Sequence, residues 1–263
     1  MIRRIPVTDA VRALFDGWQD TMIWSCLDGT MGSIYADDSE APPRSAMAHL
    51  GSFCFLAGEP DAALLLHKPV DISQTWVMMI AEDASWHPVI ESVFGTRAER
   101  FQRIAIKKEP DVFDPAHLHA LVRALPDGYR LERIDEKLYH RCLSEDWSRD
   151  FVGLFDDCAH FLSMGLGVVA MYGDTLAAGA SSYSRYQGGI EIEIDTHPAH
   201  RRRGLASACG AALILDCLSR GLYPSWDAHT EISASLAEKL GYHRDAPYIT
   251  YAVHAWTSSN TEE

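Results

Sequence analysis

Hydrophobic and polar residues alternate over a short segment in the second half of the chain. Between residues 190 and 195, every even position is isoleucine and every odd position is Glu or Asp. A period of two is typical of a β-strand with one buried face. After a turn that contains three arginines, a nearly continuous apolar run extends from Leu205 to Leu218. The pattern therefore predicts a strand, a basic turn and a buried helix in succession.

Shorter apolar runs bounded by Gly, Pro or capping residues predict the remaining elements. Asp28-Gly29 lies between two such runs and predicts a hairpin. Thr230 precedes an apolar stripe that stops at Gly241, so we expect a helix capped by Thr230. Further strands are expected at residues 22–27, 31–35, 53–56, 76–80, 101–106, 129–134, 167–172, 176–183 and 222–229, and helices at residues 8–18, 86–94, 115–125, 136–143 and 151–164.

Composition narrows the class of protein. Of the 263 residues, 47% are hydrophobic and 23% are charged, as in ordinary globular proteins. The formal net charge of −14 argues against a nucleic-acid partner. The cysteines and histidines show no disulfide or zinc spacing, so we expect reduced thiols and no metal. The apolar runs are too short to span a membrane and the N-terminus lacks a signal-type core, which predicts a cytoplasmic protein without a membrane partner.

The turn from Arg201 to Ala206 is the strongest candidate for ligand binding. A helix start offers free backbone N–H groups and the positive end of the helix dipole to an anion. Gly204 and Ala206 allow a phosphate to approach the backbone closely, and the arginines add charge-assisted contacts. On an acidic protein, such a local basic spot suits a small anionic ligand, and the chemistry implies a pyrophosphate. An ordinary basic helix start on the surface is the alternative.

The pattern Arg201-x-x-Gly204-x-Ala206 resembles the acetyl-CoA loop of the GCN5-related N-acetyltransferase (GNAT) superfamily. In that superfamily a strand and an Asn-led helix that ends in Leu-Gly-Phe follow the cofactor helix. Here Thr230 takes the place of the Asn and Leu240-Gly241-Tyr242 the place of the ending. The segments 191–196, 203–206, 224–228 and 236–242 further resemble bacterial acetyltransferases of the zwittermicin A self-resistance type.

The resemblance implies the GNAT acyl-CoA N-acyltransferase fold, an α/β (α+β) fold with a central mixed sheet flanked by helices. The expected elements from residue 129 to residue 252 follow the order of that fold. We divide the chain into an N-terminal lobe at 1–110, a catalytic domain at 114–256 and a flexible tail at 257–263. From element order alone, the lobe is interpreted as a degenerate copy of the same fold. It either covers the acceptor side of the site or forms a homodimer interface.

The resemblance also implies an activity, the direct transfer of acetyl from acetyl-CoA to an amine of a small polar molecule in a ternary complex. Two alternatives stay open: a non-catalytic acyl-CoA-binding or interaction protein, and an acetyltransferase that acts on a protein lysine or N-terminus. The residues expected to contact acetyl-CoA are Ile194, Asp195, Thr196, Arg201, Arg202, Arg203, Gly204, Leu205, Ala206, Ser207, Thr230 and Ser233.

Attack by an amine requires a base, because the amine must be neutral to attack. Three acids line one face of the alternating strand, and we expect Glu193 to be the base, with Glu191 as the second candidate. The plain alternative is the solvated face of a half-exposed strand. Asp227 is expected to hold the ammonium group of the substrate, with a turn-capping role as the alternative. The tyrosine that usually acts as the general acid falls at Ala237, so the proton donor is a water or one of three tyrosines, Tyr183, Tyr186 or Tyr242.

Overall fold

The computed structural model describes residues 1–39, 42–69, 72 and 74–257, which form two compact units. The N-terminal unit consists of Met1–Arg103 and the segment that starts at Pro247, and the C-terminal unit of Ile104–Ala246. The division after Arg103 precedes the boundary expected from the sequence, and the end of the chain belongs to the N-terminal unit. From residue 258 on, the expected tail lies outside the described residues.

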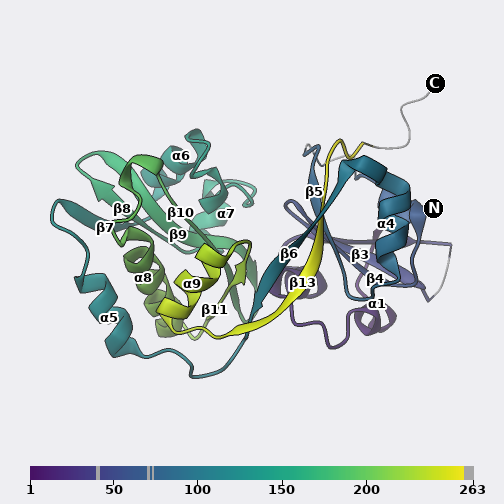
Figure 1. Ribbon diagram of the computed structural model, residues 1–263, viewed down its shortest axis with the longest axis horizontal. Helices are drawn as coiled ribbons and strands as arrows, with labels where there is room; N and C mark the ends of the chain where they lie inside the picture. Colours follow the sequence, from purple (N-terminus) through teal and green to yellow (C-terminus); the bar gives the residue numbers. More distant parts are fainter. Residues whose placement is uncertain (40–41, 70–71, 73, 258–263) are drawn as a thin grey trace. The chain divides into compact units, whose positions relative to one another are not determined.

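The C-terminal unit is built on a five-stranded mixed sheet with the order β11-β10-β9-β8-β7 (Figure 1). The first four strands in sequence pair antiparallel in succession, and β11 lies parallel to β10. The strands are β7 (Tyr129–Arg133), β8 (Gly167–Tyr172), β9 (Thr175–Tyr186), β10 (Gly189–Thr196) and β11 (Tyr223–Ser225). The helices are α5 (Pro115–Arg123), α6 (Glu136–Ser144), α7 (Cys158–Met164), α8 (Leu205–Ser219) and α9 (Glu231–Leu240).

Helix α8 forms the centre of the hydrophobic core of this unit. Its residues are apolar on nearly all sides because the sheet packs on one side of it and α5 and α9 on others (Figure 1). Gly210 allows a close approach, since an added Cβ would lie 2.9 Å from Leu240 Cδ1 and 3.3 Å from Ile194 Cδ1. The absence of a side chain at Gly210 therefore allows α8 to pack closely against α9 and the second half of β10.

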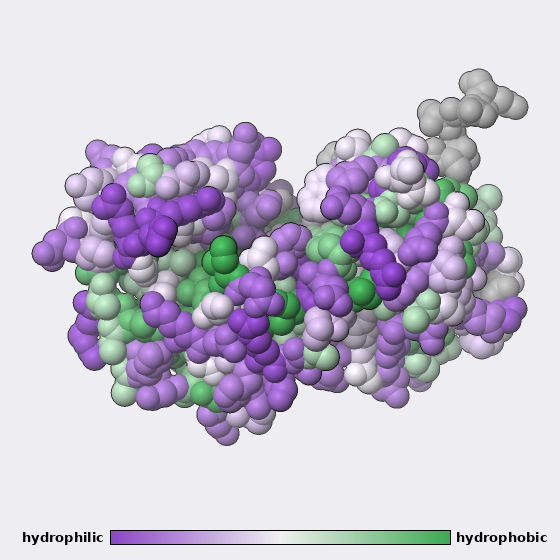
Figure 2. Space-filling model, in the orientation of Figure 1, coloured by the Kyte–Doolittle hydropathy of each residue, from purple (hydrophilic) through white to green (hydrophobic). Residues whose placement is uncertain are grey.

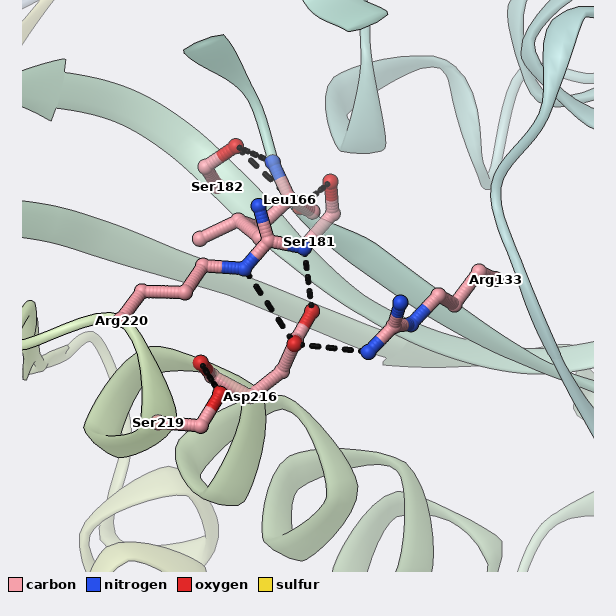
Figure 3. Close-up of polar contacts among 7 residues, drawn as sticks. All are labelled: Arg133, Leu166, Ser181, Ser182, Asp216, Ser219 and Arg220. Atoms are coloured by element: carbon pink, nitrogen blue, oxygen red, sulfur yellow. Dashed lines mark hydrogen bonds and ion pairs between the residues drawn. The ribbon is translucent and has the colours of Figure 1, made fainter.

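The C-terminal end of α8 is tied to the edge of the sheet by Asp216 (Figure 3). One carboxylate oxygen accepts a hydrogen bond from Arg133 Nη2 of β7 at 2.8 Å, and the other lies 3.2 Å from Arg220 Nη2. The Asp216 side chain is only 8% exposed. A largely buried carboxylate is stable in this position because both of its oxygens are paired with guanidinium groups.

The N-terminal unit repeats the same order of elements. Strands β1 to β4 pair antiparallel in succession, and β5 lies parallel to β4, as β11 lies parallel to β10. The strands are β1 (Ile2–Ile5), β2 (Ser33–Asp37), β3 (Ser45–Leu50), β4 (Phe53–Gly58), β5 (Val77–Ala81) and β6 (Ala98–Ile106), and the helices are α1 (Asp9–Leu14), α2 (Thr21–Asp28), α3 (Ala62–Leu66) and α4 (Trp86–Phe94). Both the element order and the strand pairing therefore support the interpretation of this half as a copy of the fold.

The final strand of each half of the sequence pairs within the other unit. Strand β13 (Arg244–Val253) lies antiparallel to β5, with Thr250 opposite Ile80. The end of β6 pairs with the two-residue strand β12 (Asp227–Ala228), with Asp227 opposite Ala105. Each unit thus includes a strand segment from the other half of the sequence.

Two expected elements are wrong. Residues 22–27 belong to helix α2, so the predicted strand and the hairpin at Asp28-Gly29 do not form. The Asp20 side chain caps this helix at Met22 N and Ile23 N, and Gly29 ends it in the left-handed conformation. Residues 151–164 are not one helix, because a 3₁₀ turn at Arg149–Phe151 precedes a separate helix capped by Asp157.

The surface is predominantly hydrophilic on the face that Figure 2 shows. The large hydrophobic side chains that are exposed come from different elements of the two units: Met1, Leu66, Trp76, Leu143, Leu162, Tyr172, Leu218 and Ile232. Among the residues that the structure describes, no helix has the length and hydropathy needed to cross a bilayer.

Candidate functional site

Strands β10 and β11 separate part-way along β10. Their parallel pairing covers Gly189 to Glu191, which lie opposite Tyr223 to Ser225. Beyond Ser225 the chain turns away and forms β12 against β6. From Ile192 to Thr196, β10 is therefore paired with β9 on one side only, as far as the described residues show. An unpaired strand edge of this kind can take up an extended ligand by backbone hydrogen bonds.

A bulge in the neighbouring strand marks the same point. Glu191 lies opposite Ser184, but Ile192 lies opposite Ser182, so Tyr183 is the extra residue of β9. A bulge increases the local twist and redirects side chains. The bulge and the separation of β11 therefore occur together, at the position between Glu191 and Ile192.

The basic turn follows the end of the open edge. Gly204 is the N-cap of α8 with φ +79°, and it brings no side chain to the helix start. An ideal Cβ at Gly204 would meet no heavy atom within 4 Å. Arg202 has φ +63°, a left-handed conformation that few non-glycine residues adopt. The turn therefore presents the first N–H groups of α8 to open space.

The three arginines have different surroundings. Arg201 is tied back to β10, because its Nε donates to Thr196 O at 3.1 Å and its Nη2 lies 3.8 Å from Asp195 Oδ1. Arg202 and Arg203 are exposed. The next buried residue, Leu205, packs in the core, and Ser207 in the first turn of α8 is 6% exposed. The arrangement leaves two guanidinium groups beside the open helix start.

The acid face of β10 runs from a buried end to an exposed one. Glu191 is only 6% exposed, whereas the Asp195 side chain is 42% exposed and Glu193 is half-buried. Glu193 lies opposite Ser181, and Asp195 lies opposite Gly179. The isoleucines of the opposite face pack on the core of α8. The alternation predicted from the sequence is therefore present, with the most buried acid at the point where β11 separates.

The sequence profile of the GNAT acetyltransferase family matches residues 12–251. The chain belongs to this family. A GCN5-related N-acetyltransferase-like protein from Streptococcus suis 89/1591 is 47% identical, with a TM-score of 0.87 over 93% of this chain and 97% of that one. The uncharacterized N-acetyltransferase YdfB of Bacillus subtilis (strain 168) is 25% identical over 253 residues, which are 92% of this chain and 94% of YdfB.

A tandem GNAT protein from the clavulanic acid biosynthesis pathway shares the fold at 12% identity, with a TM-score of 0.53 over 97% of this chain and 98% of that one. The expected superfamily and fold are thus confirmed, and the zwittermicin A type remains a prediction. The structural similarity to that tandem GNAT protein extends over both units of this chain.

Three tyrosines of this GNAT protein are electrostatically coupled to Glu191. Burial and the nearby Glu191 carboxylate raise the pKa of Tyr186, and burial is also the main reason for the raised pKa of Tyr223 and Tyr242. Tyr242 is 2% exposed and its hydroxyl donates to Pro224 O at 2.6 Å. Tyr186 is 7% exposed. All three phenols therefore keep their protons at neutral pH.

The other expected site residues lie after the separation of the strands. Asp227 pairs with Ala105 of β6, so its strand is not the one that pairs with β10. Thr230 caps α9, since its Oγ1 accepts from Ser233 N at 3.2 Å, and Ser233 Oγ accepts from Trp226 Nε1 at 3.1 Å. Each hydroxyl accepts one hydrogen bond within the protein and retains its own proton as a donor.

Two buried serines beside Glu191 were not expected as site residues. Ser184 of β9 and Ser225 of β11 lie opposite Glu191 on either side of it, and both are fully buried. Serine is common in exposed strands and turns, so neither residue type nor spacing indicates a buried polar row. Only the pairing of three strands brings these side chains to one position.

Proposed function

We propose that this GNAT protein transfers acetyl from acetyl-CoA to an amine of a small polar molecule. The observation that carries the proposal is the open edge of β10 at Ile192–Thr196, which is followed, after a 3₁₀ turn at Pro198–His200, by the uncapped start of α8. An extended arm with a pyrophosphate at one end matches this combination of a strand edge and an anion site. The tandem GNAT protein was solved without AcCoA, and that ligand is the donor that we propose for this chain.

The residues of the turn fit the pyrophosphate of acetyl-CoA. The N–H groups of Leu205, Ala206 and Ser207 belong to the first turn of α8, where helix N–H groups have no partner inside the helix. The space in front of Gly204 is open, and Arg202 and Arg203 are exposed beside it. We assign the backbone of Ile194, Asp195 and Thr196 to the extended arm, Arg201 to the support of the turn, and the hydroxyls of Thr230 and Ser233 to cofactor contacts.

For the base, the burial of the acid face supports Glu191 ahead of Glu193. Glu191 lies at the last paired position of β10 and β11, so its carboxylate is next to the point where the open edge begins. A buried carboxylate resists ionisation more than an exposed one, which brings a carboxyl group closer to the proton affinity that a base at neutral pH needs. Glu193 remains the second candidate, and Asp227 is assigned to the ammonium group of the acceptor.

For the general acid, Tyr186 replaces the tyrosine that is missing at Ala237. Ala237 is fully buried and has no proton to donate. The Tyr242 hydroxyl is committed to Pro224 O, whereas Tyr186 lies opposite Gly189, close to Glu191 in the same strand pair. Its raised pKa keeps the phenol protonated at neutral pH, as a general acid must be before the thiolate leaves.

The test is turnover of acetyl-CoA with a library of small amines, basic peptides and peptide N-termini, read by release of the free thiol. We expect release with small polar amines and slower release with peptides. Faster release with peptides would assign the protein to lysine or N-terminal acetylation. Acetyl-CoA binding without release for any acceptor would support the non-catalytic alternative, which the alanine at position 237 favours.

A further inference from the structure

Three polar side chains occupy one row across the sheet of the C-terminal unit. Ser184 of β9 and Ser225 of β11 are the register partners of Glu191 on the two sides of β10. Side chains of directly opposite residues project from the same face of a sheet. The row lies at the last paired position of β10 and β11, immediately before the open edge.

The two serines of this row are exceptional in their hydrogen bonding. Both side chains are fully buried, and neither hydroxyl has a hydrogen-bond partner among the residues that the structure describes. A buried hydroxyl without a partner costs free energy, and native proteins supply one, often an ordered water. Two such hydroxyls on either side of one carboxylate therefore point to bound water as their hydrogen-bond partner.

Other buried serines of the same sheet show that this is not a general property of the fold. Ser181 Oγ donates to Phe151 O at 2.5 Å and lies 2.9 Å from Leu166 O. Ser182 Oγ accepts from Leu166 N at 2.9 Å (Figure 3). The serines that lie away from Glu191 are satisfied by the backbone, whereas the two beside it are not.

We propose that Ser184 and Ser225 are positioning residues for Glu191, and that each hydroxyl holds a buried water that bridges to the Glu191 carboxylate. A water can donate one proton to the carboxylate and use its second proton and its lone pairs for the serine and for the acceptor. The inference rests on the proposed function, in which Glu191 is the base.

The proton transfer of this arrangement is balanced. An N–H bond of the acceptor ammonium breaks, the proton moves through the bridging water to a Glu191 oxygen, and the electron pair stays on the nitrogen. The carboxylate becomes a carboxylic acid and the amine becomes a neutral nucleophile. The charge of Glu191 raises the pKa of three tyrosines on neighbouring elements, Tyr186, Tyr223 and Tyr242. These phenols remain neutral and do not compete for this proton.

The first experiment compares Ser184→Ala, Ser225→Ala and the double variant with Ser182→Ala. Loss of hydrogen-bond donors to a carboxylate makes it a stronger base, so the acid limb of the kcat/KM profile should move to higher pH by about half a unit to one unit. The melting temperature should change little, because no protein hydrogen bond is lost. Ser182→Ala should do the opposite, with a lower melting temperature and an unchanged pH profile, since it removes the bond to Leu166 N.

Two results would overturn the inference about the serines, and both can be distinguished from a failure of the proposed acetyl transfer. In the first result, the double variant keeps the acid limb of the wild type, whereas Glu191→Gln abolishes it. The serines would then have no role in positioning, but Glu191 would still be the base. Independently of activity, a high-resolution crystal structure of the full chain should show a water within hydrogen-bond distance of Ser225 Oγ and the Glu191 carboxylate, and the Ser225→Ala protein should lose it. No water at either serine would also overturn the inference, even if no amine were ever acetylated.

Discussion

Glu191 of β10 lies opposite Ser225 of β11 at the last position where these two strands pair. The open edge of β10 begins one residue later and ends at Thr196, and a 3₁₀ turn at Pro198–His200 connects it to the Arg201–Gly204 turn. At about 3.3 Å per residue, the five residue steps from Glu191 to Thr196 span roughly 17 Å. The buried acid and the anion site therefore lie at the two ends of one edge, as a donor with a reactive end and an anionic end requires.

Replacement of Gly204 by Val should abolish stabilisation of the protein by acetyl-CoA, because the side chain would enter the open space in front of α8. Gly221, beyond the other end of α8, is the matched control. It also has positive φ, at +68°, and open space around its Cβ position. Both variants should lose about 1 kcal/mol of stability from backbone strain, but only Gly204→Val should lose the rise in melting temperature on addition of acetyl-CoA. Equal cofactor responses in the two variants would contradict the assignment of the turn.

Replacement of Glu191 by Gln should lower kcat by roughly 10²-fold or more and leave the affinity for acetyl-CoA unchanged, since general base catalysis typically contributes 10² to 10⁴. In the wild type, kcat/KM should rise with pH through the titration of the base, and the glutamine variant should lose this dependence. Glu193→Gln is the comparison, because Glu193 lies on the same face but is less buried. A larger loss in Glu193→Gln would make Glu193 the base, and no loss in either would move the assignment to Asp227.

Replacement of Asp216 by Asn should lower the free energy of unfolding by about 1 kcal/mol, because the ion pair with Arg133 holds α8 against β7 and the pair with Arg220 supports the last turn of α8. Chemical denaturation measures the change. Asp146→Asn is the control, since Asp146 forms an ion pair with Arg149 but its side chain is 98% exposed. Such exposed pairs contribute little, so similar losses in the two variants would argue against a specific role for Asp216.

The thiols should be nearly unreactive in the folded protein below pH 9. Burial raises the pKa of Cys142, Cys209 and Cys217 to about 12 from an ordinary value near 9.0. The folded chain then keeps protons that the unfolded chain releases, so stability falls as pH rises above 9. Labelling with a thiol reagent at pH 8 should be slow, with Cys158, which is only half-buried, reacting first. Fast labelling of Cys209 or Cys217 would contradict the burial of α8.

The elements that carry the site were predictable because their signals are local. Helix α8 starts at Leu205 and α9 follows Thr230, as the sequence predicts, since α8 is a long apolar run between two glycines and α9 is an apolar stripe between the cap Thr230 and Gly241. Helix α2 was misread because the apolar and small residues from Met22 to Leu27 fit a strand as well as a helix, and Asp28-Gly29 resembles a hairpin turn. Asp20 and Gly29 indicate the helix correctly, because they are its N-terminal and C-terminal caps.

The features that depend on distant segments could not be predicted. The exchange of β13 and the end of β6 joins segments that are far apart in the sequence, and no local pattern specifies such a partner. The same holds for the row of Ser184, Glu191 and Ser225, because Ser225 lies beside Glu191 only through the pairing of β11 with β10. Sequence reasoning found the acids but could not rank them, because burial is set by the neighbouring strands.

Finally, each chain should bind one acetyl-CoA, although the fold is present twice. In the N-terminal unit the turn after β4 reads Gly58-Glu59-Pro60-Asp61 where the C-terminal unit has its arginines. The Asp61 side chain itself accepts from Ala63 N, so a carboxylate already takes the place of an anion at the start of α3. Helix α3 also has only five residues, which gives it a weak dipole. Titration calorimetry should give a stoichiometry near one, lost entirely in Gly204→Val and unchanged in Asp61→Ala. Binding that persists in Gly204→Val, or a second equivalent in the wild type, would show that the N-terminal copy has kept a cofactor site.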